Sequence, residues 1–147
     1  MGATAQPGGA VPAAAGDVAE FRATPPSLRR TLRSFGYAGA GLRYLARTQP
    51  NFRVHLAATA AVVGTAIGVD APPLEIAVLL LAIGLVLVGE AVNTAIEAVV
   101  DLASPALHPL ARVAKDVAAA AVLLAAIIAA VTGVLLMGPR IWRLLPL

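Results

Sequence analysis

The chain has 147 residues, of which 59% are hydrophobic and only 13% charged, with a net charge of +3 and no cysteine. Soluble domains usually carry about 25% charged residues, so this composition excludes an ordinary water-soluble domain and indicates a small membrane protein. The lack of cysteine excludes disulfides and thiolate metal sites. Arginines concentrated near the N-terminus suit the phosphate groups of a lipid or nucleotide, and we expect no nucleic-acid partner.

Residues 1–26 are rich in Ala, Gly and Pro and lack periodicity, which predicts a disordered N-terminal tail. From Ser27 the pattern changes, because leucines and Phe35 recur at roughly helical spacing while arginines occupy other faces. This predicts a basic amphipathic helix over about 27–49, lying in the membrane interface. A solvated charged face is the alternative interpretation of these arginines.

Three apolar spans follow, at about 52–69, 74–101 and 112–137. The first is short for the ~20 residues that a crossing requires. Residues 70–73 form a turn, residues 103–109 a loop, and Gly138-Pro139 is expected to end the third span. The predicted fold is therefore all-α and integral to the membrane, with an N-terminal amphipathic surface helix and three transmembrane helices.

The placement of basic residues predicts the topology. Seven arginines lie at or before residue 53, Arg112 and Lys115 lie at the very start of the third span, and the 70–75 loop has no basic residue. By the positive-inside rule, the N-terminus and the 102–116 loop face the cytoplasm. Arg140 and Arg143 then fall on the outer side, against the rule.

One stripe of polar residues follows fourteen uncharged residues in the second span. Glu90, Asn93, Glu97 and Asp101 are spaced by 3, 4 and 4 residues, so they share one helix face. At 1.5 Å per residue, Glu90 lies roughly 21 Å along the helix from Ile76, past the midplane, and Glu97 is about 10 Å further, near the cytoplasmic interface. Ionisable groups inside a bilayer are costly, which makes the stripe a candidate functional site.

The depths of these carboxylates indicate different chemistry. Low dielectric around Glu90 disfavours the charged form, a condition suited to acid–base catalysis. Glu97 is close enough to water to stay ionised and bind Mg²⁺, with phosphate oxygens completing the shell. Lys115 is suited to phosphate, and it lies beside Arg112 and Asp116. A metal-bridged phosphate at the cytoplasmic face fits this mixture.

Other interpretations are kept. The stripe could only hold helices together, as Asn often does, in a non-catalytic membrane subunit. An ion-translocating subunit needs one acid near the midplane, which leaves Glu97, Asp101 and Lys115 unexplained. Lys115 alone could be a topological anchor. His55 and His108 have no partner at metal-site spacing, so each alone suits a structural role.

Two stretches carry a family resemblance. The run GEAVNTAIEAVVDL, followed by HPLARVAKDVAAAAVLL, resembles the prokaryotic diacylglycerol kinase family, which includes undecaprenol kinases. The segments Gly36–Arg43 and Asn51–His55 also match, and the resemblance covers about residues 28–137. The pair of motifs E-x-x-N-[ST]-A-I-E-x-x-[VI]-D and A-K-D, in this order, is very specific.

The resemblance implies a membrane lipid kinase domain over 27–147, in a homotrimer in the bacterial cytoplasmic membrane. Active sites would lie at the cytoplasmic interface between subunits, where the γ-phosphate of MgATP moves to a lipid hydroxyl. Glu90 matches the catalytic base and Glu97 a metal ligand, with Asn93 and Asp101 as supporting polar residues. The implied nucleotide contacts are Arg30, Tyr37, Gln49, Glu97, His108, Lys115 and Asp116.

One position departs from the family pattern. Gln49 stands where members commonly have a second metal-binding glutamate, so it offers a carbonyl oxygen without the charge. The Asn51–His55 segment, with Arg53 and His55 as lipid contacts, resembles members that favour undecaprenol. Undecaprenol is therefore the expected substrate, and diacylglycerol the alternative.

Overall fold

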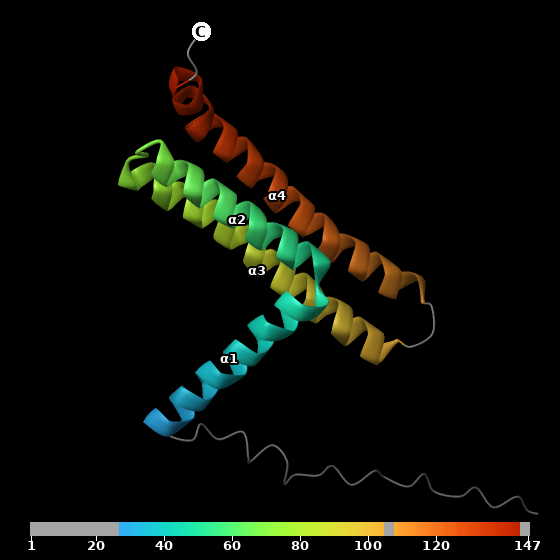
Figure 1. Ribbon diagram of the computed structural model, residues 1–147. Coiled ribbons are helices and arrows are strands. Elements are labelled where there is room, and N and C mark those ends of the chain that lie inside the picture. The colour runs from blue at the N-terminus through green and yellow to red at the C-terminus, as the bar shows by residue number, and fades with distance from the viewer. Residues whose placement is uncertain (1–26, 105–107, 145–147) are drawn as a thin grey trace, which may run out of the picture. The chain divides into compact units, whose positions relative to one another are not determined.

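The computed structural model describes residues 27–104 and 108–144, which form four helices and, within those ranges, no strand (Figure 1). The helices are α1 (Leu28–Thr48), α2 (Pro50–Gly68), α3 (Pro73–Ala103) and α4 (Pro109–Leu144). The all-α prediction is confirmed, and the expected disordered tail lies outside the described residues. A boundary between two compact units falls inside α1, after Tyr37, and the two units are described separately.

The first unit contributes the start of α1, the helix expected over about 27–49. Leu28, Leu32 and Phe35 are exposed, although they form the apolar part of an amphipathic pattern. An exposed apolar face opposite arginines is typical of a helix that lies in a membrane interface.

The second unit is built around α3. This helix packs along α4 most extensively and also against α2, whereas α2 and α4 touch little (Figure 1). Pro50 and Pro73 occupy the first turns of α2 and α3, where their missing N–H groups have no helical partner to lose. Glu75 lies in the first turn of α3, where a carboxylate complements the helix dipole.

A tight turn joins α2 to α3. Asp70 has a φ of 50°, in the left-handed region that Asp tolerates better than most residues. The N–H of Ala71 donates to the carbonyl of Ala66 at 2.9 Å, which closes a Schellman-type end to α2. Ala66 and Ala71 are buried in one cluster with Leu79 of α3 and Met137 of α4. The turn therefore sits on the apolar core at this end of the helices.

The expected end of the third span at Gly138-Pro139 is wrong, because α4 continues through Pro139 to Leu144. Proline removes one backbone donor but does not prevent the following turn from forming when other contacts hold it. Arg140 supplies those contacts, since its Nε and Nη2 donate to the two carboxylate oxygens of Glu75 at 2.7 Å each. This ion pair neutralises the charge of Arg140, which explains why a basic residue can stand at the end of the helix that is expected to face outward.

Two described helices, α3 and α4, are long and apolar enough to cross a membrane, and α2 is not among them. Both expose large apolar side chains, for example Leu81 of α3 at 76% and Val134 of α4 at 70%. Together with the composition, these helices indicate a membrane protein. The third expected crossing, by α2, stays a prediction.

Candidate functional site

The polar stripe of α3 becomes more exposed along the helix, in the order expected. Glu90 is 3% exposed and Asn93 8%, Glu97 is half-buried, and Asp101 is exposed. Thr94 adds a third buried polar side chain, whose hydroxyl donates to the carbonyl of Glu90 at 3.0 Å. Burial of Glu90 comes from protein packing, so its carboxyl group is shielded from water even without lipid.

Asn93 connects the buried and exposed parts of the stripe. Its Nδ2 donates to Glu97 Oε1 at 3.1 Å, one helical turn away. Its Oδ1 is buried and has no hydrogen-bond partner among the described residues. Buried carbonyl oxygens are normally paired, so this acceptor is available to a donor from a ligand or another chain. The bond also fixes one oxygen of Glu97, which leaves the other for a cation.

The start of α4 meets the end of α3 through an ion pair. Lys115 Nζ donates to Asp101 Oδ1, and both side chains are partly exposed. Asp101 was expected only as a supporting polar residue, and the structure gives it this specific partner. Arg112 and Asp116 approach to 3.9 Å on the exposed face of α4, a pair too solvated to fix either side chain. Lys115 and Asp116 therefore lie near the exposed end of the stripe.

His108 has a local structural role. Its Nδ1 accepts a hydrogen bond at 3.2 Å from the N–H of Leu110, a donor without a helical partner in the first turn of α4. The ring is exposed beside the segment that joins α3 to α4. Its expected contact with nucleotide is untested by this arrangement.

The start of α2 carries the remaining candidates of the second unit. Gln49 is the N-cap residue of α2, but its side chain does not cap the helix and instead donates to Thr48 Oγ1 at 3.4 Å. Arg53 is exposed, whereas His55 is half-buried and lines a cavity. No group of three or more acidic or histidine side chains that could hold a metal occurs within residues 27–104 and 108–144. A metal site built on Glu97 would need further ligands from phosphate, water or another chain.

Arg30 and Tyr37 belong to the first unit. Tyr37 is 70% exposed. Their roles as nucleotide contacts therefore remain predictions.

Sequence reasoning missed the Glu75–Arg140 pair. The two residues are 65 positions apart. A signal did exist, because an acid at the start of one long apolar helix and a base at the end of the next meet when the helices are antiparallel.

The described residues include two long apolar helices, a buried carboxylate on the first of them and a lysine–carboxylate pair that joins their ends. These features define the class as a helical membrane protein with a polar site near one end of its bundle. The model of the family described as prokaryotic diacylglycerol kinase matches residues 36–137. The chain belongs to this family. Its members' names place it in the class of lipid kinases, which are phosphotransferases that use a nucleotide donor.

Three named relatives support the assignment. A diacylglycerol kinase of Synechocystis is 45% identical over 76% of this chain, and the match spans 65% of that relative. An undecaprenol kinase of Bacillus subtilis is 41% identical over 78% of this chain and 93% of the relative. A diacylglycerol kinase of Escherichia coli is 35% identical over 74% of this chain and 88% of the relative. The chain is thus similar to enzymes named for two different lipid alcohols.

Proposed function

We propose that this protein transfers the γ-phosphate of ATP to the hydroxyl of a membrane lipid, with undecaprenol as the preferred acceptor. The buried carboxyl group of Glu90 carries the proposal, since it lies one turn from Asn93 and at the shielded end of the stripe. The similarity to an undecaprenol kinase over 93% of that relative supports the acceptor. The family resemblance of Asn51–His55 favours the same lipid.

In the proposed reaction, Glu90 accepts the proton of the lipid hydroxyl. The hydroxyl oxygen forms a bond to the γ-phosphorus as the bond to the β–γ bridging oxygen breaks, and ADP leaves with that oxygen. Exclusion of water around Glu90 would limit transfer of the phosphoryl group to water. Asn93 would hold the Glu97 carboxylate in place by donating a hydrogen bond to Glu97 Oε1.

Charge neutralisation would come from the exposed end of the stripe. Glu97 offers one free carboxylate oxygen to Mg²⁺, which would screen the charge of the phosphates when bound. Lys115 can turn from Asp101 to a phosphate oxygen, because the pair is solvated and weak. Asp116 and His108 would contact nucleotide.

Gln49, Arg30 and Tyr37 would supply further nucleotide contacts, and Arg53 and His55 would contact the lipid. Because residues 27–104 and 108–144 of one chain bring together too few ligands for a metal, the proposal includes a homotrimer with sites between copies. It also includes α2 as a third crossing, and a cytoplasmic location for the N-terminus and the Lys115 end, as the positive-inside rule predicts.

Diacylglycerol is the second candidate acceptor. It is favoured by the similarity to the Synechocystis enzyme named diacylglycerol kinase. The chemistry would be unchanged, since both lipids present a primary hydroxyl at the membrane surface. Only the fit of the hydrocarbon part would differ.

Purified protein with labelled ATP and Mg²⁺, given both lipids in competition, tests the proposal. We expect labelled undecaprenyl phosphate in excess, and preferential labelling of diacylglycerol would overturn the choice of acceptor. Glu90→Gln should abolish labelling of either lipid while leaving assembly intact. Asp70→Asn is the matched control, because it removes a carboxylate at an exposed turn whose left-handed backbone Asn also tolerates. Full activity in Glu90→Gln would exclude Glu90 as the base.

A further inference from the structure

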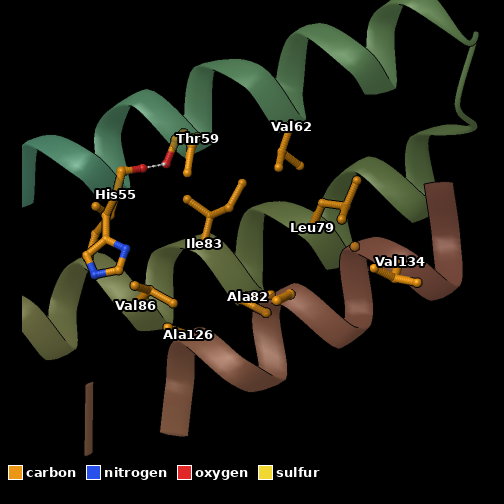
Figure 2. A pocket seen from close by; sticks show the side chains of 14 residues that line it. His55, Thr59, Val62, Leu79, Ala82, Ile83, Val86, Ala126 and Val134 are labelled. Atoms are coloured by element: carbon orange, nitrogen blue, oxygen red, sulfur yellow. Dashed lines mark hydrogen bonds between the residues drawn. The ribbon is translucent and has the colours of Figure 1, made fainter. Parts of the chain in front are cut away.

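A cavity of about 330 Å³ lies between α2, α3 and α4 (Figure 2). His55 lines it from α2, Leu79 and Val86 from α3, and Ala126 and Val134 from α4. All three helices belong to the second unit, so one chain forms the cavity. Small side chains on α4 leave the space open, since a larger residue at Ala126 would project into it.

The cavity has an apolar interior with one polar end. Its lining contains one ionisable side chain, His55, and one hydroxyl, that of Thr59. The Thr59 hydroxyl already donates to the backbone carbonyl of His55 at 2.7 Å (Figure 2). A buried water needs two to four polar partners, which the remaining lining does not offer. The space therefore suits hydrocarbon better than water or a polar ligand.

The cavity continues the stripe of α3 that contains Glu90. Leu79, Val86 and Glu90 are spaced by 7 and 4 residues, so they share one helix face, and all three are buried. Leu79 and Val86 are about 10 Å apart along the helix, and Glu90 is about 6 Å beyond Val86. His55 lies beside Val86 in Figure 2, at the end of the cavity nearer Glu90.

We propose that this cavity holds the first part of the hydrocarbon chain of the acceptor lipid, with its polar head at His55 and its chain directed towards Leu79. The inference rests on the proposed function, in which Glu90 meets the lipid hydroxyl. A volume of 330 Å³ holds about eleven water-sized groups, so it accepts one chain of roughly ten carbons and not two side by side. The cavity thus selects alcohols with a single chain.

Selection between acceptor lipids must come from the shape of the cavity, because the bilayer around the protein is as apolar as the cavity and burial of the chain gives no preference. Gly133 lines the cavity two helical turns beyond Ala126, away from His55, and a Cβ there would meet no atom within 4 Å. Gly133→Leu should therefore fill this end of the space, and Ala60→Leu is the matched control at an exposed position of α2. Kinetics of the full-length protein in mixed micelles would compare a long-chain polyprenol with a five-carbon prenol. We expect Gly133→Leu to raise KM for the polyprenol about tenfold, with the five-carbon prenol and the Ala60→Leu variant changed less than about twofold. Equal effects on both acceptors would overturn the inference.

A binding measurement separates this inference from the kinase proposal. A polyprenol carrying a diazirine near its hydroxyl end should crosslink to the peptide around Ala126 in the wild type, and about tenfold less in Gly133→Leu. Crosslinking without phosphorylation would refute the kinase function and keep the cavity site, whereas phosphorylation without this crosslink would do the reverse. If Gly133→Leu does not fold, Val134→Ala decides. By enlarging the cavity it should lower the ratio of KM for diacylglycerol to KM for polyprenol about threefold, and an unchanged ratio would overturn the inference.

Discussion

Asn93 provides a sharp test of the site, because one polar atom of its side chain is hydrogen-bonded and the other is not. Nδ2 donates to Glu97 Oε1 at 3.1 Å, and Oδ1 is buried with no partner among the described residues. In Asn93→Leu, loss of a hydrogen bond to a charged group costs about 1.5–3 kcal/mol, while removal of the unpaired acceptor returns about 1–3 kcal/mol. The two effects largely cancel, so the free energy of unfolding should change by no more than about 2 kcal/mol.

Asn93→Asp should behave very differently. It places a second carboxylate oxygen at the 3.1 Å separation from Glu97, where two unit charges at an effective dielectric constant of about 20 repel by about 5 kcal/mol. This repulsion is an upper limit, because Glu97 is only half-buried. Lowering the pH should relieve it, since a proton shared between the carboxyl groups removes one charge.

Thermal unfolding of both variants and the wild type in one detergent, at pH 7 and pH 5, measures these effects. We expect Asn93→Asp to be the least stable at pH 7 and to approach the wild type at pH 5. Asn93→Leu should keep its stability and lose phosphoryl transfer. A stable Asn93→Asp together with an unstable Asn93→Leu would refute the assigned hydrogen bond, and would mean that the amide presents its oxygen to Glu97.

Three further outcomes are expected. Lys115→Ala should raise KM for ATP in the phosphorylation assay, whereas Asp101→Asn should not. In both variants the free energy of unfolding should change by less than about 1 kcal/mol, because the ion pair is solvated. Equal changes in KM would contradict a phosphate contact by Lys115. Glu75→Gln and Arg140→Gln should each lower the Tm in detergent. The double variant should have a Tm no lower than that of the less stable single variant, because both changes break the same ion pair. Additive losses of Tm would mean that the two residues act separately. Asp70→Val should destabilise by about 1–2 kcal/mol in thermal unfolding and Asp70→Gly should not, since only the β-branched side chain opposes the left-handed backbone; equal stability would exclude strain at this turn.

The sequence was sufficient where local spacing determines geometry. Spacings of three and four residues place Glu90, Asn93 and Glu97 on one face of any helix, so the stripe and its order of burial could be predicted. The four-residue spacing also allows the Asn93–Glu97 bond. Helical spacing predicted the first segment, and the three later segments were predicted from the length of their apolar spans.

The sequence was insufficient where distant segments meet. Just beyond Pro139, α4 continues and Arg140 binds Glu75, and no local pattern reveals a partner 65 positions away. The partner of Asp101 depends likewise on how α3 and α4 pack. The cavity at His55 is a property of three helices together, since no single segment has an interior.

The turn at Asp70 has a consequence for how the protein is made. Only a few residues separate α2 from α3, and the left-handed residue and the Ala71–Ala66 hydrogen bond fix their connection. Of these two helices, α3 alone is apolar enough for insertion into a bilayer on its own. If α2 crosses the membrane, it must enter as the first arm of a hairpin, together with α3 once that helix has been synthesised. Lengthening this turn would then reduce the number of membrane crossings without altering any side chain of the candidate site.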